Sequence, residues 1–241
     1  MNNHGYTMLF YCISYFLFFG ILLLSKEKNA NRLFDKNGLI SDLRILIVLH
    51  IIGIILFGIL PAFTKHLFSF ALYNSFDIKS LPTWITALLI IIVIINTTRF
   101  VTKNYGDVAP RSSITTSFNV LNIKTYLFAR IIFICVYESW FRGYLLNDCI
   151  ISFGAPVAIL LNIIFYTLLH LVNGKAEALA CIPFGLILCG LCLWQRSVWP
   201  AIVIHLALTL SYEISFLQQM KKYKTQRNES FNNRGIRLYR K

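Results

Sequence analysis

The chain has 241 residues, of which 57% are hydrophobic and only 14% are charged, and its mean hydropathy is +0.64. This balance excludes an ordinary soluble globular domain, in which about a quarter of the residues carry a charge. A formal net charge of +13 would favour nucleic acid as a partner in a soluble protein. In a membrane protein, basic residues instead report topology and contact with anionic lipid. We therefore expect an integral, multi-pass membrane protein whose partner is the lipid bilayer and not nucleic acid.

Apolar segments long enough to cross a hydrocarbon core of about 30 Å recur along the chain. We expect about seven spanning helices, so the predicted fold is an all-α polytopic transmembrane bundle. The predicted spans are 6–24, 45–60, 84–100, 125–146, 155–172, 176–194 and 199–217. The first is interpreted as a spanning helix and not as a removable signal, because no basic segment precedes it and no small-residue cleavage site follows it.

The charges outside the spans predict the orientation of the chain. The segment 218–241 carries eight Lys or Arg residues against the single Glu229, and the positive-inside rule places this tail in the cytoplasm. Seven spans then place the N-terminus outside. The aromatic-rich segment 61–82 leaves open an interfacial helix or half-span, which would reverse the topology before it. We divide the chain into N-terminal helices and loops (1–124), a helical core (125–217) and the basic tail (218–241).

The fourth predicted span carries three charged residues, Arg130, Glu138 and Arg142. A charged side chain near the bilayer centre costs roughly 2.5 to 3.5 kcal/mol, so this helix requires charged partners or a wet cavity. Glu138 and Arg142 are four positions apart and therefore share a helix face, with about 6 Å between them. A buried ion pair that only fixes helix packing would by itself explain these two residues.

Two further apolar spans contain His170 and His205. A single histidine in such a helix is more often a hydrogen-bonded packing residue than a chemical group. Together with Glu138 and Arg142, however, these histidines place a carboxylate, a guanidinium and two imidazoles on three late helices. A carboxylate can take a proton from water, and imidazoles can stabilise an oxyanion or bind a metal. The set predicts hydrolysis inside the membrane, with no certain cofactor and with a divalent metal such as Zn²⁺ left open.

These residues resemble the motifs of the CAAX prenyl endopeptidase and bacteriocin-processing (CPBP, or Abi) intramembrane proteases. The family pattern is Glu-Glu-x-x-x-Arg, then Phe-x-x-x-His, then His-x-x-x-Asn or Asp, each on a separate helix. Here "ESWFRG" supplies Glu138 and Arg142, "YTLLH" supplies His170 and "HLALT" supplies His205. The resemblance covers about residues 125–215. It implies an endopeptidase that cuts a membrane-embedded or lipid-modified protein or peptide.

Three positions depart from the family pattern. Tyr137 replaces the first glutamate, to which the family assigns activation of the attacking water, and a phenol with an unperturbed pKa of about 10 is a poor base near neutral pH. Tyr166 replaces the phenylalanine, and Thr209 replaces the last Asn or Asp. In one interpretation Glu138 takes over as base, from a position rotated by about 100° on the helix. In the other, the chain is an inactive relative that acts as a binding, immunity or scaffold protein.

In the active interpretation, Glu138 activates or orients the water and Arg142 fixes Glu138. His170 and His205 then hold the water or the tetrahedral oxyanion, directly or through a metal. Counting residues along straight helices separates His170 from Glu138 and His205 by roughly 15 Å in depth. A rival hypothesis of a different class is a haem held by two histidines, with His50 as one candidate ligand. It leaves Glu138 and Arg142 unexplained.

Two further features are interpreted as structural. Cys189 and Cys192 form a CxxC motif inside an apolar helix with no positive neighbour, which favours packing over redox chemistry. Glu213 follows His205 by eight residues and approaches the basic tail, so we expect it at the membrane interface.

Overall fold

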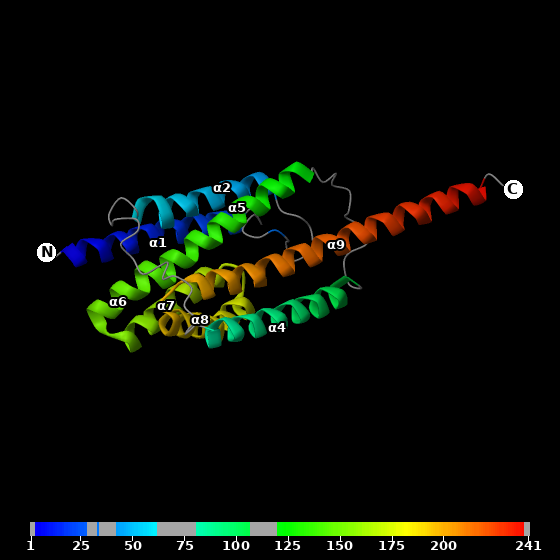
Figure 1. Ribbon diagram of the computed structural model, residues 1–241. Coiled ribbons are helices and arrows are strands. Elements are labelled where there is room, and N and C mark those ends of the chain that lie inside the picture. The colour runs from blue at the N-terminus through cyan, green and yellow to red at the C-terminus, as the bar shows by residue number, and fades with distance from the viewer. Residues whose placement is uncertain (1–2, 28–32, 34–41, 62–80, 107–119, 239–241) are drawn as a thin grey trace.

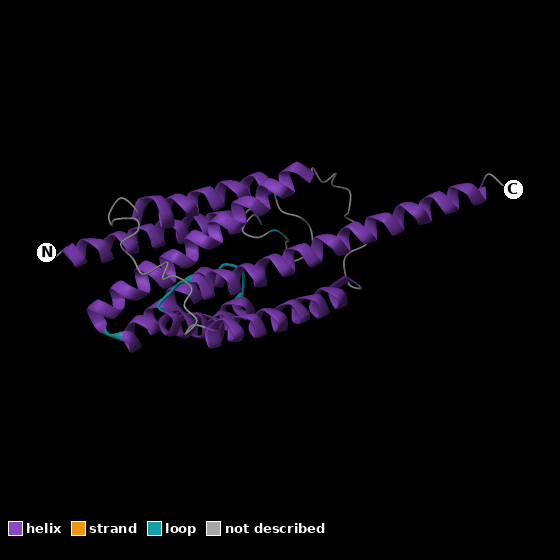
Figure 2. Ribbon diagram, viewed as in Figure 1, coloured by secondary structure: helices purple, strands orange, loops and turns teal. Residues whose placement is uncertain are grey.

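A computed structural model describes residues 3–27, 33, 42–61, 81–106 and 120–238. Within these ranges the chain consists of helices joined by short connections, and it contains no strand (Figure 1, Figure 2). The prediction of an all-α fold is therefore confirmed. Nearly all of the segment 61–82, for which an interfacial helix stayed open, lies outside the described residues.

The helices follow one another along the chain with two π-helical interruptions. In order they are α1 (Asn3–Glu27), α2 (Leu43–Ile54) with its π-helical continuation η1 (Ile55–Ile59), α4 (Leu81–Gly106), α5 (Val120–Glu138), the π-helical segment η4 (Ser139–Leu145), α6 (Leu146–Phe153), α7 (Ala155–Leu171), α8 (Lys175–Gln195) and α9 (Trp199–Leu238). The predicted fourth span thus lies in one continuous helical stretch formed by α5, η4 and α6.

Length and composition divide the predicted spans into groups. Among the described residues, three helices are long and apolar enough to cross a membrane: Thr7–Lys26, Lys175–Gln195 and Trp199–Gln218. Three shorter apolar helices, Leu43–Ile59, Trp84–Phe100 and Ala155–Leu171, coincide with three further predicted spans. The remaining predicted span, 125–146, is helical throughout and differs from these six by its three charged residues.

Local sequence signals set several helix ends. The side chain of Asp42 caps α2 by accepting a hydrogen bond from the backbone N–H of Arg44 at 2.9 Å. Gly154 separates α6 from α7 at φ 81°, and Gly174 separates α7 from α8 at φ 140°, where a residue with a side chain would be strained. These two glycines therefore mark the breaks between consecutive helices.

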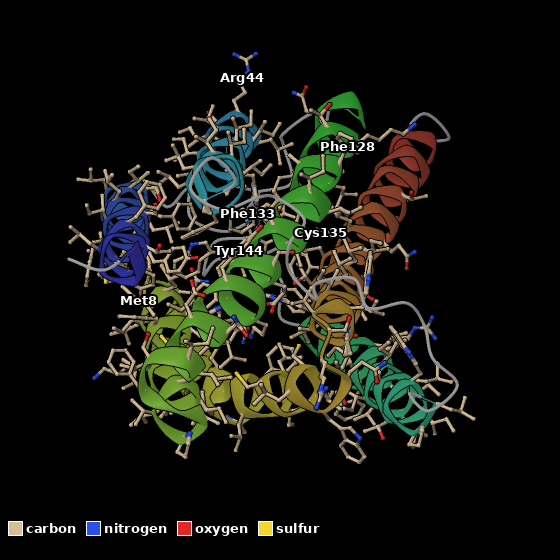
Figure 3. The ribbon with its side chains drawn as sticks, turned by 60° about the vertical axis from the view of Figure 1, so that its left-hand side comes forward. Met8, Arg44, Phe128, Phe133, Cys135 and Tyr144 are labelled. Atoms are coloured by element: carbon tan, nitrogen blue, oxygen red, sulfur yellow. The ribbon has the colours of Figure 1, made fainter. Side chains whose placement is uncertain are left out.

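Helix α5 lies between the N-terminal helices and α9, and the stretch continues through η4 to α6 at the lower left edge of the view in Figure 1. Contacts pack α2 along α5, α7 along α8, and α4 along α9. Figure 3 shows Phe133 on the side of α5 that faces α2, where its ring packs against those of Phe18 and His50 at centroid distances of 5.7 Å and 5.0 Å. The core is rich in aromatic side chains, among them Tyr11, Tyr15, Phe57, Trp140, Phe141 and Tyr166.

The π-helical segment η4 begins directly after Glu138. Its wide turn is visible in the hydrogen bond from the backbone N–H of Leu146 to the carbonyl of Phe141, five residues earlier. The same carbonyl accepts a second hydrogen bond from the side-chain amide of Asn162 on α7, at 2.5 Å. Asn162 is completely buried, so this contact ties α7 to the widened turn.

Replacement of Gly53 by alanine is expected to lower the free energy of unfolding by about 1 to 3 kcal/mol, because inserting a methyl into a filled core forces side chains to shift. A Cβ at this position would overlap the ring of Phe133. The matched control is Gly20→Ala, where a Cβ would meet nothing within 4 Å. The control is expected to be neutral or to stabilise α1 by up to about 1 kcal/mol. Thermal unfolding in detergent compares the two variants, and equal shifts would contradict the close approach of α2 and α5.

Candidate active site

A pocket of about 130 Å³ lies between α1, α2, α5, α7 and α9, with the first turn of α8 at its edge. One part of its wall is apolar and is formed by Phe18, Leu22, Leu33, Leu46, Leu49, Phe133, Ile134 and Leu169. The other part is polar and is formed by His50, Tyr126, Arg130, Tyr137, His170, Asn173, Glu177, His205 and Glu213. Two of the four residues predicted for the site, His170 and His205, therefore share one cavity.

Glu138 and Arg142 lie directly behind this wall. Nη1 of Arg142 is 3.0 Å from Oε2 of Glu138, and neither side chain has any exposed surface. The other carboxylate oxygen of Glu138 lies 2.5 Å from Nδ1 of His205. The predicted pairing of the glutamate with the arginine is present, and the carboxylate points to a histidine and not into the pocket.

Aromatic packing holds the guanidinium of Arg142 in place. Its central carbon lies 4.3 Å from the centroid of the Tyr166 ring and 5.5 Å from that of Phe141. A cation over an aromatic face is stabilised by the ring quadrupole, and more so away from water. Arg142 is therefore fixed by a charge and by two rings, and it in turn fixes Glu138.

The second histidine has its own carboxylate. Nδ1 of His170 is 2.8 Å from Oε1 of Glu177, which also accepts a hydrogen bond of 2.7 Å from the side-chain amide of Asn173. The side chain of Glu177 is 42% exposed and lines the pocket. Sequence reasoning missed this residue. The available signal was its place in the first turn of the helix after the Asn173-Gly174 turn, which folds α8 back against α7.

The expected separation in depth of roughly 15 Å between the two histidines is wrong. The Tyr166 ring lies between them, at centroid distances of 4.7 Å from His170 and 6.3 Å from His205. The residue count assumed straight and parallel helices. Figure 3 shows instead that the gold helix α8, along which α7 packs, lies across the direction of α5 and α9. Because the helices cross, side chains at different heights on them reach the same cavity.

Tyr137, and not Glu138, occupies the pocket wall. Its side chain is buried, with 4% of the residue exposed, and its ring centroid is 6.0 Å from that of His205. The turn of about 100° between neighbouring helix positions explains why one of the two residues faces the cavity and the other faces away. Thr209, at the last motif position, is not among the described residues that line the pocket.

A second polar cluster lies farther along the same pocket, and it corrects the interpretation of Glu213. This residue is buried, with 5% exposed, and is not an interfacial charge. Its Oε1 accepts a hydrogen bond of 2.9 Å from the hydroxyl of Tyr126 and lies 3.5 Å from Nε of Arg130. The expectation failed because the partners are on α5, far away in the sequence.

His50 belongs to this second cluster, and both of its ring nitrogens have partners. Nδ1 donates to the carbonyl of Leu46 at 2.5 Å, and Nε2 accepts from Nη1 of Arg130 at 3.1 Å. To bind haem iron, His50 would have to give up the hydrogen bond from Arg130. These contacts count against the haem hypothesis.

The sequence left open a divalent metal at the site, but the described side chains do not form a metal-binding group. Across the described parts of the chain, no three or more His, Cys, Asp or Glu side chains form a group that could hold a metal ion. His170 and His205 supply two imidazoles without a third ligand, whereas protein zinc sites have at least three. The residues do not fit a resident metal, and the chemistry proposed below uses the side chains alone.

One part of the chain matches a known protein family. Residues 119–211 match the Rce1-like family, described as type II CAAX prenyl endopeptidase Rce1-like. Over these residues, which are fewer than half of the 241 in the chain, the sequence is similar to that family. The resemblance predicted from the motifs is confirmed, and the Rce1-like segment contains both histidines with their carboxylates Glu138 and Glu177. The comparisons with curated proteins and with solved structures gave no match.

Proposed function

We propose that this protein is an intramembrane endopeptidase that hydrolyses a peptide bond of a membrane-embedded or lipid-modified protein. The observation that carries this proposal is a pair of histidines on different helices, which line one pocket and each have Nδ1 held by a carboxylate. The Rce1-like match of residues 119–211 supports the reaction class. In this proposal about seven helices span the bilayer, and the basic tail 218–241 lies in the cytoplasm.

His170 and Glu177 are the general base. A neutral imidazole whose Nδ1–H donates to a carboxylate keeps its lone pair on Nε2, which can accept a proton. The carboxylate fixes this tautomer and stabilises the imidazolium that forms. The side chain of His170 is 20% exposed, so water in the pocket can reach it.

His205 orients the same water molecule. Glu138 holds Nδ1 of His205, and Arg142 holds Glu138, so the imidazole is fixed from behind the wall. Its Nε2 then accepts the second hydrogen of the water while His170 accepts the first. A water held by two acceptors presents its lone pair to the substrate carbonyl. Glu138 is here a positioning residue, because its two carboxylate oxygens face Arg142 and His205 and it is not among the described residues that line the pocket.

The reaction follows from these positions. The water oxygen bonds to the carbonyl carbon, the water proton passes to Nε2 of His170, and the carbonyl electron pair moves to oxygen. When the tetrahedral intermediate collapses, the C–N bond breaks and His170 returns its proton to the leaving nitrogen. The products are a new carboxyl terminus and a new amino terminus.

The apolar part of the pocket suits the proposed substrate class. Phe18, Leu22, Leu33, Leu46 and Leu49 form an apolar wall that can contact an alkyl chain or a hydrophobic helix of the substrate. Contact of this kind favours a lipid-modified or membrane-embedded chain over a soluble peptide, because only the former has apolar surface to bury there.

One observation favours a second function, a membrane binding or scaffold protein without catalysis. The family glutamate that faces the cavity is here Tyr137, and Glu138 has no exposed surface. If the pair of His170 and Glu177 does not act as a base, the pocket is a binding site of the same shape.

Mapping of new peptide termini in membranes separates these two functions. The comparison uses the wild type, a double variant His170→Gln/His205→Gln and the control Trp194→Phe, at matched expression. Glutamine keeps a polar side chain but cannot take up the proton, and Trp194 is 72% exposed on α8, away from the pocket. We expect termini that depend on the wild type, persist in the control and vanish in the double variant. Identical profiles in all membranes would favour the binding protein.

A further inference from the structure

The hydroxyl of Tyr137 is buried without a hydrogen-bond partner among the described residues. Other buried tyrosines in this bundle are satisfied: Tyr11 donates to Asp148 at 2.9 Å, Tyr15 to the carbonyl of Phe165 at 2.8 Å and Tyr126 to Glu213 at 2.9 Å. An unpaired buried donor costs free energy, so most native proteins avoid one. The side chains of Trp140 and Thr167 also have buried polar atoms without a partner, but Tyr137 differs from them in lining the pocket, where a ligand could supply the partner.

The proposed reaction requires a hydrogen-bond donor for the oxyanion in this part of the pocket. In the proposed reaction His170 and His205 both act as acceptors through Nε2, so neither stabilises the negative oxygen of the tetrahedral intermediate as it first forms. Tyr126 and Asn173 donate to carboxylates, and Arg130 donates to His50 through Nη1 while its Nε lies 3.5 Å from Glu213. Tyr137 lines the same wall, and its O–H has no hydrogen-bond partner in the part of the chain that the structure describes.

We propose that Tyr137 donates a hydrogen bond to the oxyanion of the tetrahedral intermediate; this inference rests on the proposed hydrolysis. The phenol stays protonated throughout and transfers no proton. A donor aimed at the place where charge develops strengthens as the carbonyl becomes an oxyanion, and therefore accelerates the chemical step more than it favours binding.

This assignment explains why a tyrosine can stand where the family has its first glutamate. An ionised carboxylate at position 137 would repel an oxyanion, whereas a phenol attracts it. The base is then provided by His170 with Glu177, which lie on α7 and α8. The ring of Tyr137 packs at 6.0 Å from that of His205 and at 6.1 Å from that of Tyr166, which holds the hydroxyl-bearing side chain at the site.

The test compares two variants that each remove one buried phenolic hydroxyl, Tyr137→Phe and Tyr15→Phe. The assay uses the purified full chain and an internally quenched, lipid-modified peptide built on a cleavage site from the terminus mapping. We expect Tyr137→Phe to lower kcat by about 10² to 10³-fold with little change in KM, as for removal of one oxyanion donor. Its melting temperature should not fall, because the Tyr137 hydroxyl makes no hydrogen bond to any described residue. Tyr15→Phe should lower the melting temperature and keep the wild-type kcat, because it loses the bond to Phe165 outside the pocket.

Each other outcome overturns the inference in a recognisable way. Wild-type kcat in Tyr137→Phe, with an active wild-type protein, would exclude the oxyanion role and leave the proposed hydrolysis intact. A loss of activity in Tyr137→Phe that accompanies a fall in melting temperature would assign the hydroxyl a structural role. A wild-type protein that cuts neither the peptide nor any membrane protein would overturn the hydrolysis and this inference together.

Discussion

Replacement of Glu138 by leucine is expected to lower the free energy of unfolding by about 3 to 5 kcal/mol, because removing one partner of a buried ion pair leaves the other charge uncompensated. Both side chains of the pair have no exposed surface, so water cannot replace the carboxylate beside Arg142. His205 loses the partner of its Nδ1 in the same substitution. We expect the variant to accumulate poorly in membranes and to unfold at a much lower temperature in detergent.

The double variant Glu138→Leu/Arg142→Met is the control for this prediction. Replacing both members of a buried pair by apolar residues of similar volume is often neutral or stabilising. We therefore expect the double variant to regain most of the lost stability while remaining inactive, because His205 is no longer positioned. A double variant as unstable as Glu138→Leu would show that the loss has another cause than the charge of Arg142.

The largest expected effect on activity is that of His170→Gln, which should lower kcat by about 10² to 10⁴-fold, the usual contribution of a general base. Glu177→Gln should have a smaller effect, since an amide at position 177 still accepts a hydrogen bond from Nδ1 of His170 but carries no charge to stabilise the imidazolium. The variant with both substitutions should be no worse than His170→Gln alone, because a missing imidazole leaves nothing to orient. Rates on the quenched peptide measure all three.

A neighbouring charge provides the matched control for Glu177. Lys175→Gln changes one exposed charge in the same turn of α8, and we expect it to leave both rate and stability close to wild type. Independent, additive losses from His170→Gln and Glu177→Gln would contradict a coupled pair. So would an unchanged rate in Glu177→Gln when the wild type is active.

Local sequence signals predicted much of the fold and part of the site. Apolar length placed the helices correctly. The four-residue spacing of Glu138 and Arg142 predicted their contact, because it depends on only one helix. The resemblance to the family motif predicted that His170 and His205 share one site, whereas the residue count along the helices predicted that they are far apart.

Contacts between helices were the part that the sequence did not reveal. Glu177 and Glu213 find their partners His170 and Arg130 across helix pairs, and a spacing rule says nothing about such pairs. The predicted separation in depth between the two histidines was wrong for the same reason. A residue count gives the height of a residue along its own helix axis but not the angle at which two helices cross. The sequence also did not reveal that Glu138 faces away from the pocket. Predicting this requires knowing which face of α5 lines the pocket, and that depends on how the helices pack.

The widened turn η4 makes the number of residues between Glu138 and Leu146 as important as their identity. Deleting one residue there would let ordinary α-helical hydrogen bonds form, but everything after it would turn by about 100° and shift by about 1.5 Å. The hydrogen bond from Asn162 to the carbonyl of Phe141 would be lost, and so would the hydrogen bond from Tyr11 to Asp148. A one-residue frame change in this segment would therefore disconnect α6 and α7 from the rest of the bundle, whereas conservative substitutions at the same positions would leave the connection in register.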